Sequence, residues 1–74
     1  MQNNTRKLAF WMYKAESFTT SDVLRWGVVN YCNGADRIAR KFREKGLLRR
    51  MENKGSKEDA YVVNIEEMEN YLRK

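Results

Sequence analysis

The 74-residue sequence predicts a single α+β domain that is mostly helical. Apolar residues recur at spacings of three and four in four segments, which is the period of an amphipathic helix. Two short runs of strand composition, LLRRM and AYVV, flank the polar segment ENKGSKED, which is the pattern of a β-hairpin. The chain contains no proline, no low-complexity stretch and no internal repeat, so we expect one folded unit over residues 1–74.

The first predicted helix covers residues 5–16, with Thr5 available as its N-cap. Its apolar stripe consists of Leu8, Ala9, Trp11, Met12 and Ala15. Residues 18–19 are expected to be extended. A second helix then begins, capped by Thr20 or Ser21, with Asp22 in its first turn near the positive helix end.

Gly27 has two interpretations in this second helix. Val23, Gly27 and Tyr31 are spaced by four residues, so Gly27 could allow another helix to approach closely. Alternatively, Gly27 ends the helix and residues 28–31 form the turn. In both cases Cys32-Asn33-Gly34 breaks the helix, because Asn and Gly tolerate positive φ.

A third helix is predicted over residues 35–45. Its apolar stripe follows the spacing i, i+3, i+4 and i+7 and consists of Ala35, Ile38, Ala39 and Phe42. Gly46 ends this helix directly after Lys45, as a glycine in the left-handed conformation commonly does. Residues 47–63 follow as the hairpin.

The last predicted helix covers residues 64–73, with Asn64 as its cap. Ile65, Met68 and Leu72 form a narrow stripe, which either packs on the first helix or is available to a second copy of the chain. Among the aromatic residues, the core is expected to hold Phe10, Trp11, Trp26, Tyr31 and Phe42. Tyr13 and Tyr61 could be surface contacts.

Composition argues against several classes of function. The chain has no His, and its single cysteine, Cys32, cannot form an intrachain disulfide or a Cys/His metal site, so we interpret it as a half-buried small residue. No Gly-rich phosphate loop or paired-carboxylate spacing occurs, so we expect neither an enzyme nor a cofactor. No apolar run approaches the ~18 residues of a membrane span, and the N-terminus lacks a secretory apolar core. We therefore expect a cytoplasmic protein.

The positive charge is concentrated in the middle of the chain. The net charge is +5, and residues 35–57 hold nine of the 15 Lys and Arg but only three of the ten Asp and Glu. Burying the apolar stripe of the third helix would point Arg37, Arg40 and Lys41 outward together. A compact domain with one strongly basic segment is a candidate to bind an anionic polymer.

The sequence resembles winged helix-turn-helix DNA-binding domains over residues 6–63. The segments that carry the likeness are FTTSDVLRWG, NGADRIARKFREKGLLRR and ENKGSKEDAYVV. The resemblance implies a three-helix core with a β-hairpin wing and a C-terminal helix, in which residues 35–45 are the recognition helix and residues 47–63 the wing. The size of the chain and its residue pattern FTTSDV…ADR…AR are also similar to those of small phage or prophage accessory and regulatory proteins.

In this family the third helix enters the major groove and the wing follows the DNA backbone. Carried over to this chain, the DNA-binding positions on the helix are Asn33, Asp36, Arg37, Arg40 and Lys41, with Arg43 and Lys45 further along. Those on the wing are Arg50, Asn53, Lys54, Ser56 and Lys57. Arg37 and Arg40 are the expected base readers and Lys41 the expected phosphate ligand, while Asp36 would orient Arg37 or Arg40.

The expected function is double-stranded DNA binding by a small transcriptional regulator, and a homodimer would read two half-sites. The alternative is a protein-protein interaction module of the same shape, such as a phage inhibitor or adaptor that binds an acidic host protein with the same basic surface. Binding of RNA or single-stranded DNA would need exposed aromatics among the basic residues. Residues 35–50 contain only Phe42, which is expected to face inward.

Overall fold

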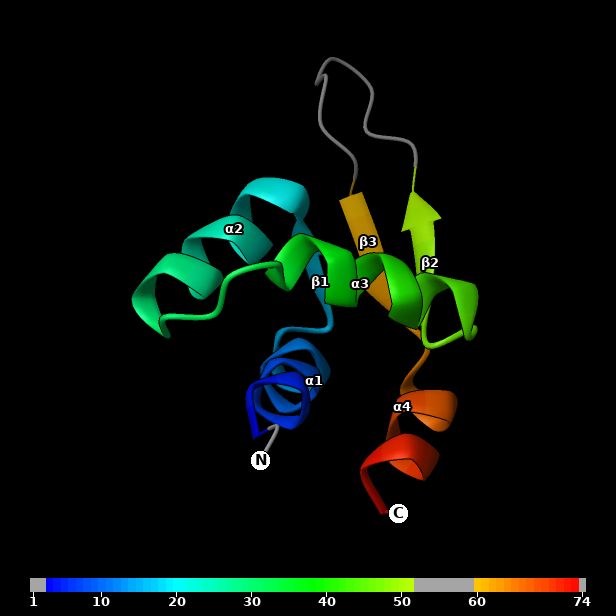
Figure 1. The fold of residues 1–74 in the computed structure, drawn as a ribbon. Coiled ribbons are helices and arrows are strands. Elements are labelled where there is room, and N and C mark those ends of the chain that lie inside the picture. Colours follow the sequence, from blue (N-terminus) through cyan, green and yellow to red (C-terminus); the bar gives the residue numbers. More distant parts are fainter. Residues whose placement is uncertain (1–2, 52–59, 74) are drawn as a thin grey trace.

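The structure is a computed structural model that describes residues 3–51 and 60–73. Within these residues it contains four helices and a three-stranded antiparallel sheet (Figure 1). The elements in chain order are α1 (Asn3–Ala15), β1 (Ser17–Thr19), α2 (Thr20–Val29), α3 (Ala35–Glu44), β2 (Leu48–Met51), β3 (Ala60–Val63) and α4 (Ile65–Arg73). The predicted mostly helical α+β class and the predicted order of elements are both confirmed.

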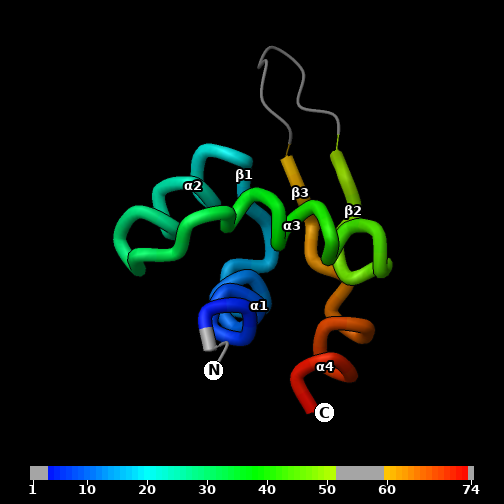
Figure 2. The backbone as a smooth tube through the Cα atoms, viewed as in Figure 1, coloured from blue at the N-terminus to red at the C-terminus, as the bar shows by residue number. Residues whose placement is uncertain are grey.

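The sheet has the strand order β1-β3-β2, so the short β1 pairs with the far strand of the hairpin. Phe18 lies opposite Tyr61, and Leu48 lies opposite Val63. The backbone N–H of Val63 also donates to the carbonyl of Glu16, at 2.9 Å. Figure 2 shows α3 crossing in front of β2 and β3, with α1 and α4 on the side away from the hairpin end. α3 therefore covers one face of the sheet (Figure 2).

The core lies between the four helices and this covered face of the sheet. The largest fully buried side chains are Phe42, Leu8, Met12, Met68 and Val23. The Phe42 ring meets the Tyr71 ring edge to face, with centroids 5.4 Å apart, which joins α3 to α4. Met68 is completely buried, Leu72 is half-buried and α4 packs on α1, as the first of the two alternatives for its apolar stripe predicted. Ile65 in that stripe remains 39% exposed.

The predicted starts of the first two helices are wrong by one or two residues, whereas α3 begins at Ala35 as predicted. α1 begins at Asn3, so Thr5 lies inside the helix, and Ala15 in its last turn is exposed. The N-cap of α2 is Thr19, because its extended backbone (φ −109°, ψ 172°) ends β1 and leaves its side chain facing the first helical turn. The Thr19 hydroxyl accepts from the Asp22 N–H at 3.2 Å, and the Asp22 carboxylate accepts from the Thr19 N–H at 3.0 Å.

Of the two interpretations of Gly27, the structure confirms close approach. α2 continues to Val29, and Gly27 is buried. A Cβ at Gly27 would lie 2.8 Å from the carbonyl oxygen of Cys32 and 3.1 Å from the Cβ of Ala35. The absence of a side chain at residue 27 therefore lets α2 approach the start of α3. Cys32 is buried rather than half-buried, and its N–H donates to the Gly27 carbonyl at 2.7 Å.

Two aromatic residues expected in the core are exposed. Phe10 is 51% exposed because it lies on the side of α1 opposite the buried Leu8 and Met12. Tyr31 is 91% exposed because α2 has ended before it and a positive φ of 54° turns its side chain away from the α2 stripe. Phe42 is buried, and Trp11 and Trp26 are half-buried against the core, as predicted.

Glu16 offers a test of local backbone strain. This exposed residue follows α1 directly and has a left-handed φ of 67°. A non-glycine residue in that conformation costs roughly 1–2 kcal/mol, which the larger entropy of an unfolded glycine partly offsets. Glu16→Gly should therefore raise the free energy of unfolding by about 0.5–1 kcal/mol in urea titrations. Lys7→Gly inside α1 is the control and should lower the free energy of unfolding by about 0.5–1 kcal/mol. If Glu16→Gly also lowers the free energy of unfolding, residue 16 is not strained.

None of the helices in residues 3–51 and 60–73 has the length and apolar character that a bilayer crossing requires.

Candidate nucleic-acid interface

α3 separates its apolar and basic side chains onto opposite sides. Ala35, Ala39 and Phe42 are buried and Ile38 is half-buried, while Arg37, Arg40, Lys41, Arg43 and Glu44 are exposed. Successive residues are rotated by about 100° along a helix, so burial of the stripe directs Arg37, Arg40 and Lys41 away from the core. The predicted stripe and its consequence for these three cations are both confirmed.

The two ends of α3 fix its position between α2 and β2. Gly34 precedes the helix with a left-handed φ of 84°, and its carbonyl accepts from the N–H groups of Arg37 and Ile38 at 3.0 and 3.1 Å. At the other end, Gly46 has φ 86° and its N–H donates to Arg43, while Leu47 donates to Phe42. These two bonds form a Schellman motif, which ends the helix and leads the chain into β2.

The register of the hairpin places Arg50 on the same side of the molecule as α3. Side chains alternate between the faces of a strand, so Arg50 shares a face with the buried Leu48, whereas Arg49 lies on the opposite face. Arg50 pairs with Tyr61. Directly paired residues of antiparallel strands project to the same face, so Arg50 and Tyr61 lie together on the α3 side. We call the exposed cations of this side the basic face: Arg37, Arg40, Lys41, Arg43 and Arg50.

A small cleft adjoins the basic face. It has a volume of about 130 Å³ and lies between the start of α2, α3 and β3. Its lining consists of Thr20, Val23, Asp36, Ala39, Arg40 and Tyr61. Asp36 is half-buried and lies one turn before Arg40 on the same side of α3. The predicted role of Asp36 in orienting an arginine is therefore compatible with Arg40 as its neighbour.

The remaining predicted positions fall in three places. Asn33 is exposed in the turn immediately before α3, beside the N-terminal end of the basic face. Lys45 is exposed but lines a different cleft, of about 350 Å³, with Leu47, Glu67, Asn70 and Tyr71 next to α4. Lys45 therefore does not join the basic face. The wing residues Asn53, Lys54, Ser56 and Lys57 lie outside the described residues.

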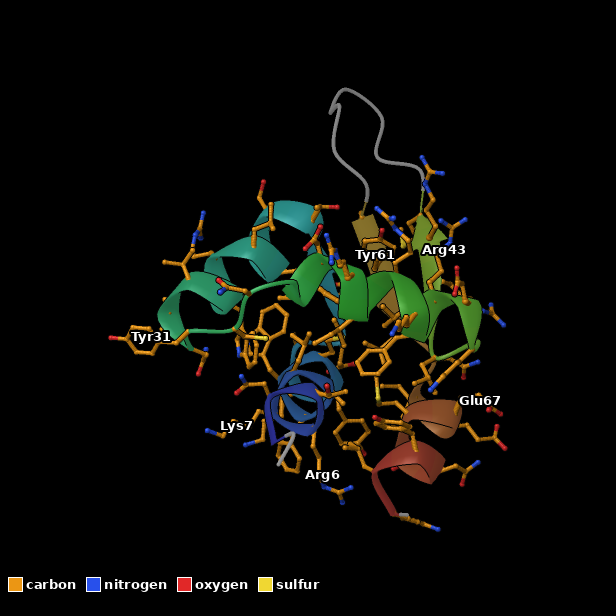
Figure 3. The ribbon with its side chains drawn as sticks, viewed as in Figure 1. Arg6, Lys7, Tyr31, Arg43, Tyr61 and Glu67 are labelled. Carbon is orange, nitrogen blue, oxygen red and sulfur yellow. The ribbon has the colours of Figure 1, made fainter. Side chains whose placement is uncertain are left out.

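Tyr61, which the sequence left open as a surface contact, lines the cleft beside the basic face. Its ring is half-buried, with its centroid 5.9 Å from that of Phe18, and it lines the cleft beside Arg40. Figure 3 shows Tyr61 and Arg43 on the half of the molecule nearest the hairpin. The alternation in AYVV predicts which face of the strand Tyr61 lies on. It does not predict that Tyr61 pairs with Arg50, because that pairing depends on the register of the hairpin.

Comparison with known proteins gives no further guide to this site. No family model, curated protein or solved structure matches the chain. Across residues 3–51 and 60–73, no group of three or more His, Cys, Asp or Glu side chains is placed to hold a metal ion. The basic face is thus the chemical feature from which a function can be inferred.

Proposed function

We propose that the chain is a winged helix-turn-helix protein that binds duplex DNA, with α3 in the major groove and the β2–β3 hairpin as the wing. The observation that carries the proposal is the convergence of five cations from α3 and β2 on one side of a small core. The major groove is about 12 Å wide and admits one α-helix. The element order helix, strand, helix, helix, hairpin is the order of this fold.

The cations have separate roles in this proposal. Arg37 and Arg40 protrude from the outer side of α3, and each guanidinium can donate two hydrogen bonds to guanine O6 and N7. Lys41, Arg43 and Arg50 lie toward the edges of the basic face and are the phosphate ligands. Three phosphate contacts would give a slope of log K against log salt of roughly −3. A small regulator of transcription is the role that best fits a domain of this size and chemistry.

Arg40→Ala should weaken duplex binding by about 1–3 kcal/mol, roughly 5- to 150-fold, because one bidentate base contact is lost. The Arg40 side chain is exposed, so the melting temperature should stay nearly unchanged. The measurement is fluorescence anisotropy with a labelled duplex, first selected from a random pool, at low and high salt. Lys7→Ala is the matched control: it also removes one charge from an exposed helical position, but at the far end of the molecule (Figure 3).

Equal affinity of Arg40→Ala and the parent protein for the selected duplex would refute the assignment of α3 to the major groove. If the parent protein shows no salt-sensitive binding to any duplex, DNA is not the ligand. The basic face would then be assigned to an acidic protein partner, which is the other function that this charge distribution fits.

A further inference from the structure

A groove between α1 and α4 lies at the opposite end of the molecule from the basic face. It has a volume of about 250 Å³ and is lined by Phe10, Tyr13, Glu69, Leu72 and Arg73. Phe10 is 51% exposed, so a large apolar surface opens into the groove. In Figure 3, Arg6 and Lys7 mark this end of the molecule, whereas Arg43 and Tyr61 lie near the hairpin. A ligand here would leave the basic face free.

Hydrogen bonds between the two helices hold this groove in shape. The Tyr13 hydroxyl donates to Oε2 of Glu69 at 2.7 Å, and the Arg6 guanidinium donates to the carbonyl of Leu72. The bond to Glu69 also raises the pKa of Tyr13 above its usual value, because the carboxylate favours the protonated hydroxyl. The Glu69 carboxylate is therefore already engaged, and the two walls of the groove are fixed before any ligand arrives.

Cations lie on both of the helices that form the groove, and one of them is over the exposed Phe10 ring. The Lys14 ammonium lies 5.1 Å from the ring centroid, and Arg6 lies one turn before Phe10 on the same side of α1. Arg73 forms part of the α4 wall. Lys14, Arg6 and Arg73 are all exposed, and Glu69 is the one carboxylate among the lining residues. The groove thus combines an apolar floor with a positively charged rim.

We propose that this α1–α4 groove binds an acidic peptide segment of another protein, whose apolar side chain sits against Phe10 and Leu72 while its carboxylates face Lys14, Arg6 and Arg73. An apolar anchor within a charged rim is the usual anatomy of a peptide-binding surface. The volume is below the ~300 Å³ at which small-molecule pockets begin, so it suits one or two side chains. Opposite charges on rim and peptide would speed association and select acidic partners.

A nucleic acid fits this groove less well than an acidic peptide. A stacked base would need an open face of Phe10, and Lys14 already lies over that ring. Peptide binding requires only the edge of the ring and the adjoining Leu72 side chain.

The test uses the full chain and a labelled peptide in which Glu and Asp alternate with Leu and Phe at helical spacing. Fluorescence anisotropy should show salt-sensitive binding, and a peptide with Gln and Asn in place of the acids should bind at least about tenfold more weakly. Phe10→Ala and Lys14→Glu should each weaken binding of the acidic peptide by at least about tenfold. The first removes the apolar anchor site, and the second replaces a cation that would face the peptide carboxylates. Leu24→Ala is the matched control, because Leu24 is an apolar residue on α2 that is 49% exposed, close to the value for Phe10. The Leu24→Ala protein should bind the acidic peptide as tightly as the parent protein does.

Several results would overturn the proposal. They are absence of binding to the acidic peptide, equal binding by the Phe10→Ala protein, and displacement of the peptide by a single-stranded oligonucleotide, which would assign the groove to nucleic acid. Self-association that Phe10→Ala abolishes would also overturn it, because a second copy of the chain would then cover the groove. Circular dichroism of each variant shows that a lost affinity is not a lost fold.

Discussion

Replacing Phe42 with alanine should lower the free energy of unfolding by about 3–5 kcal/mol, the usual loss for truncating a buried phenylalanine. Phe42 is 2% exposed and is the largest of the fully buried side chains. Its ring contacts Tyr71 on α4, and its carbonyl accepts the Leu47 N–H at 2.9 Å in the turn that leads to β2. Removal of the ring leaves a cavity where α3 and α4 meet, and a domain this small has little other core to compensate.

Urea titration followed by tryptophan fluorescence measures this loss, with the unfolding slope checked for two-state behaviour. Arg43→Ala changes the next residue of the same helix, and its exposed side chain should alter stability by no more than about 0.5 kcal/mol. If Phe42→Ala costs less than about 1 kcal/mol, the ring is not the packing centre of α3. The position of the basic face would then need another explanation.

The sequence predicted α3 because every local signal in that segment agrees. The apolar spacing of Ala35, Ile38, Ala39 and Phe42 fits one helix face, and Gly46 has the positive φ that the chain reversal needs. The outward direction of Arg37, Arg40 and Lys41 follows from that face alone. These features required no knowledge of any contact distant in the sequence.

Features set by contacts between elements could not be predicted in the same way. The position of β1 beside β3 depends on Phe18 meeting Tyr61, which no local pattern of residues 17–19 encodes. Lys45 follows the basic periodicity of α3, yet the helix ends at Glu44 and Lys45 instead adjoins α4. Tyr31 continues the spacing of Val23 and Gly27, but the positive φ at the helix end exposes it.

Gly27→Val should lower the free energy of unfolding by about 3 kcal/mol, at the upper end of the usual cost of overpacking. Gly27→Ala already places a Cβ 2.8 Å from the Cys32 carbonyl oxygen, a backbone atom that cannot rotate away as a side chain does. Alanine gains about 1 kcal/mol of helix propensity over glycine inside α2. The added Cβ should push α2 away from the Cys32 turn and Ala35, and the packing lost there should outweigh the gain in helix propensity. Gly27→Ala should therefore also lower the free energy of unfolding, by about 1 kcal/mol.

Thermal and urea unfolding of Gly27→Ala, Gly27→Val and Val28→Ala separate the close contact from helix propensity. Val28 is the next residue of α2 and is 78% exposed, so its truncation should change stability by no more than about 0.5 kcal/mol. A graded loss of stability from alanine to valine at residue 27 would show that the close packing of α3 on α2 requires the absence of a side chain at this position. A Gly27→Ala protein more stable than the parent would show instead that propensity decides at this position, and that the spacing of α2 and α3 can widen without cost. Because α3 carries the basic face, duplex titrations of the same variants would then test whether the proposed DNA binding depends on that spacing.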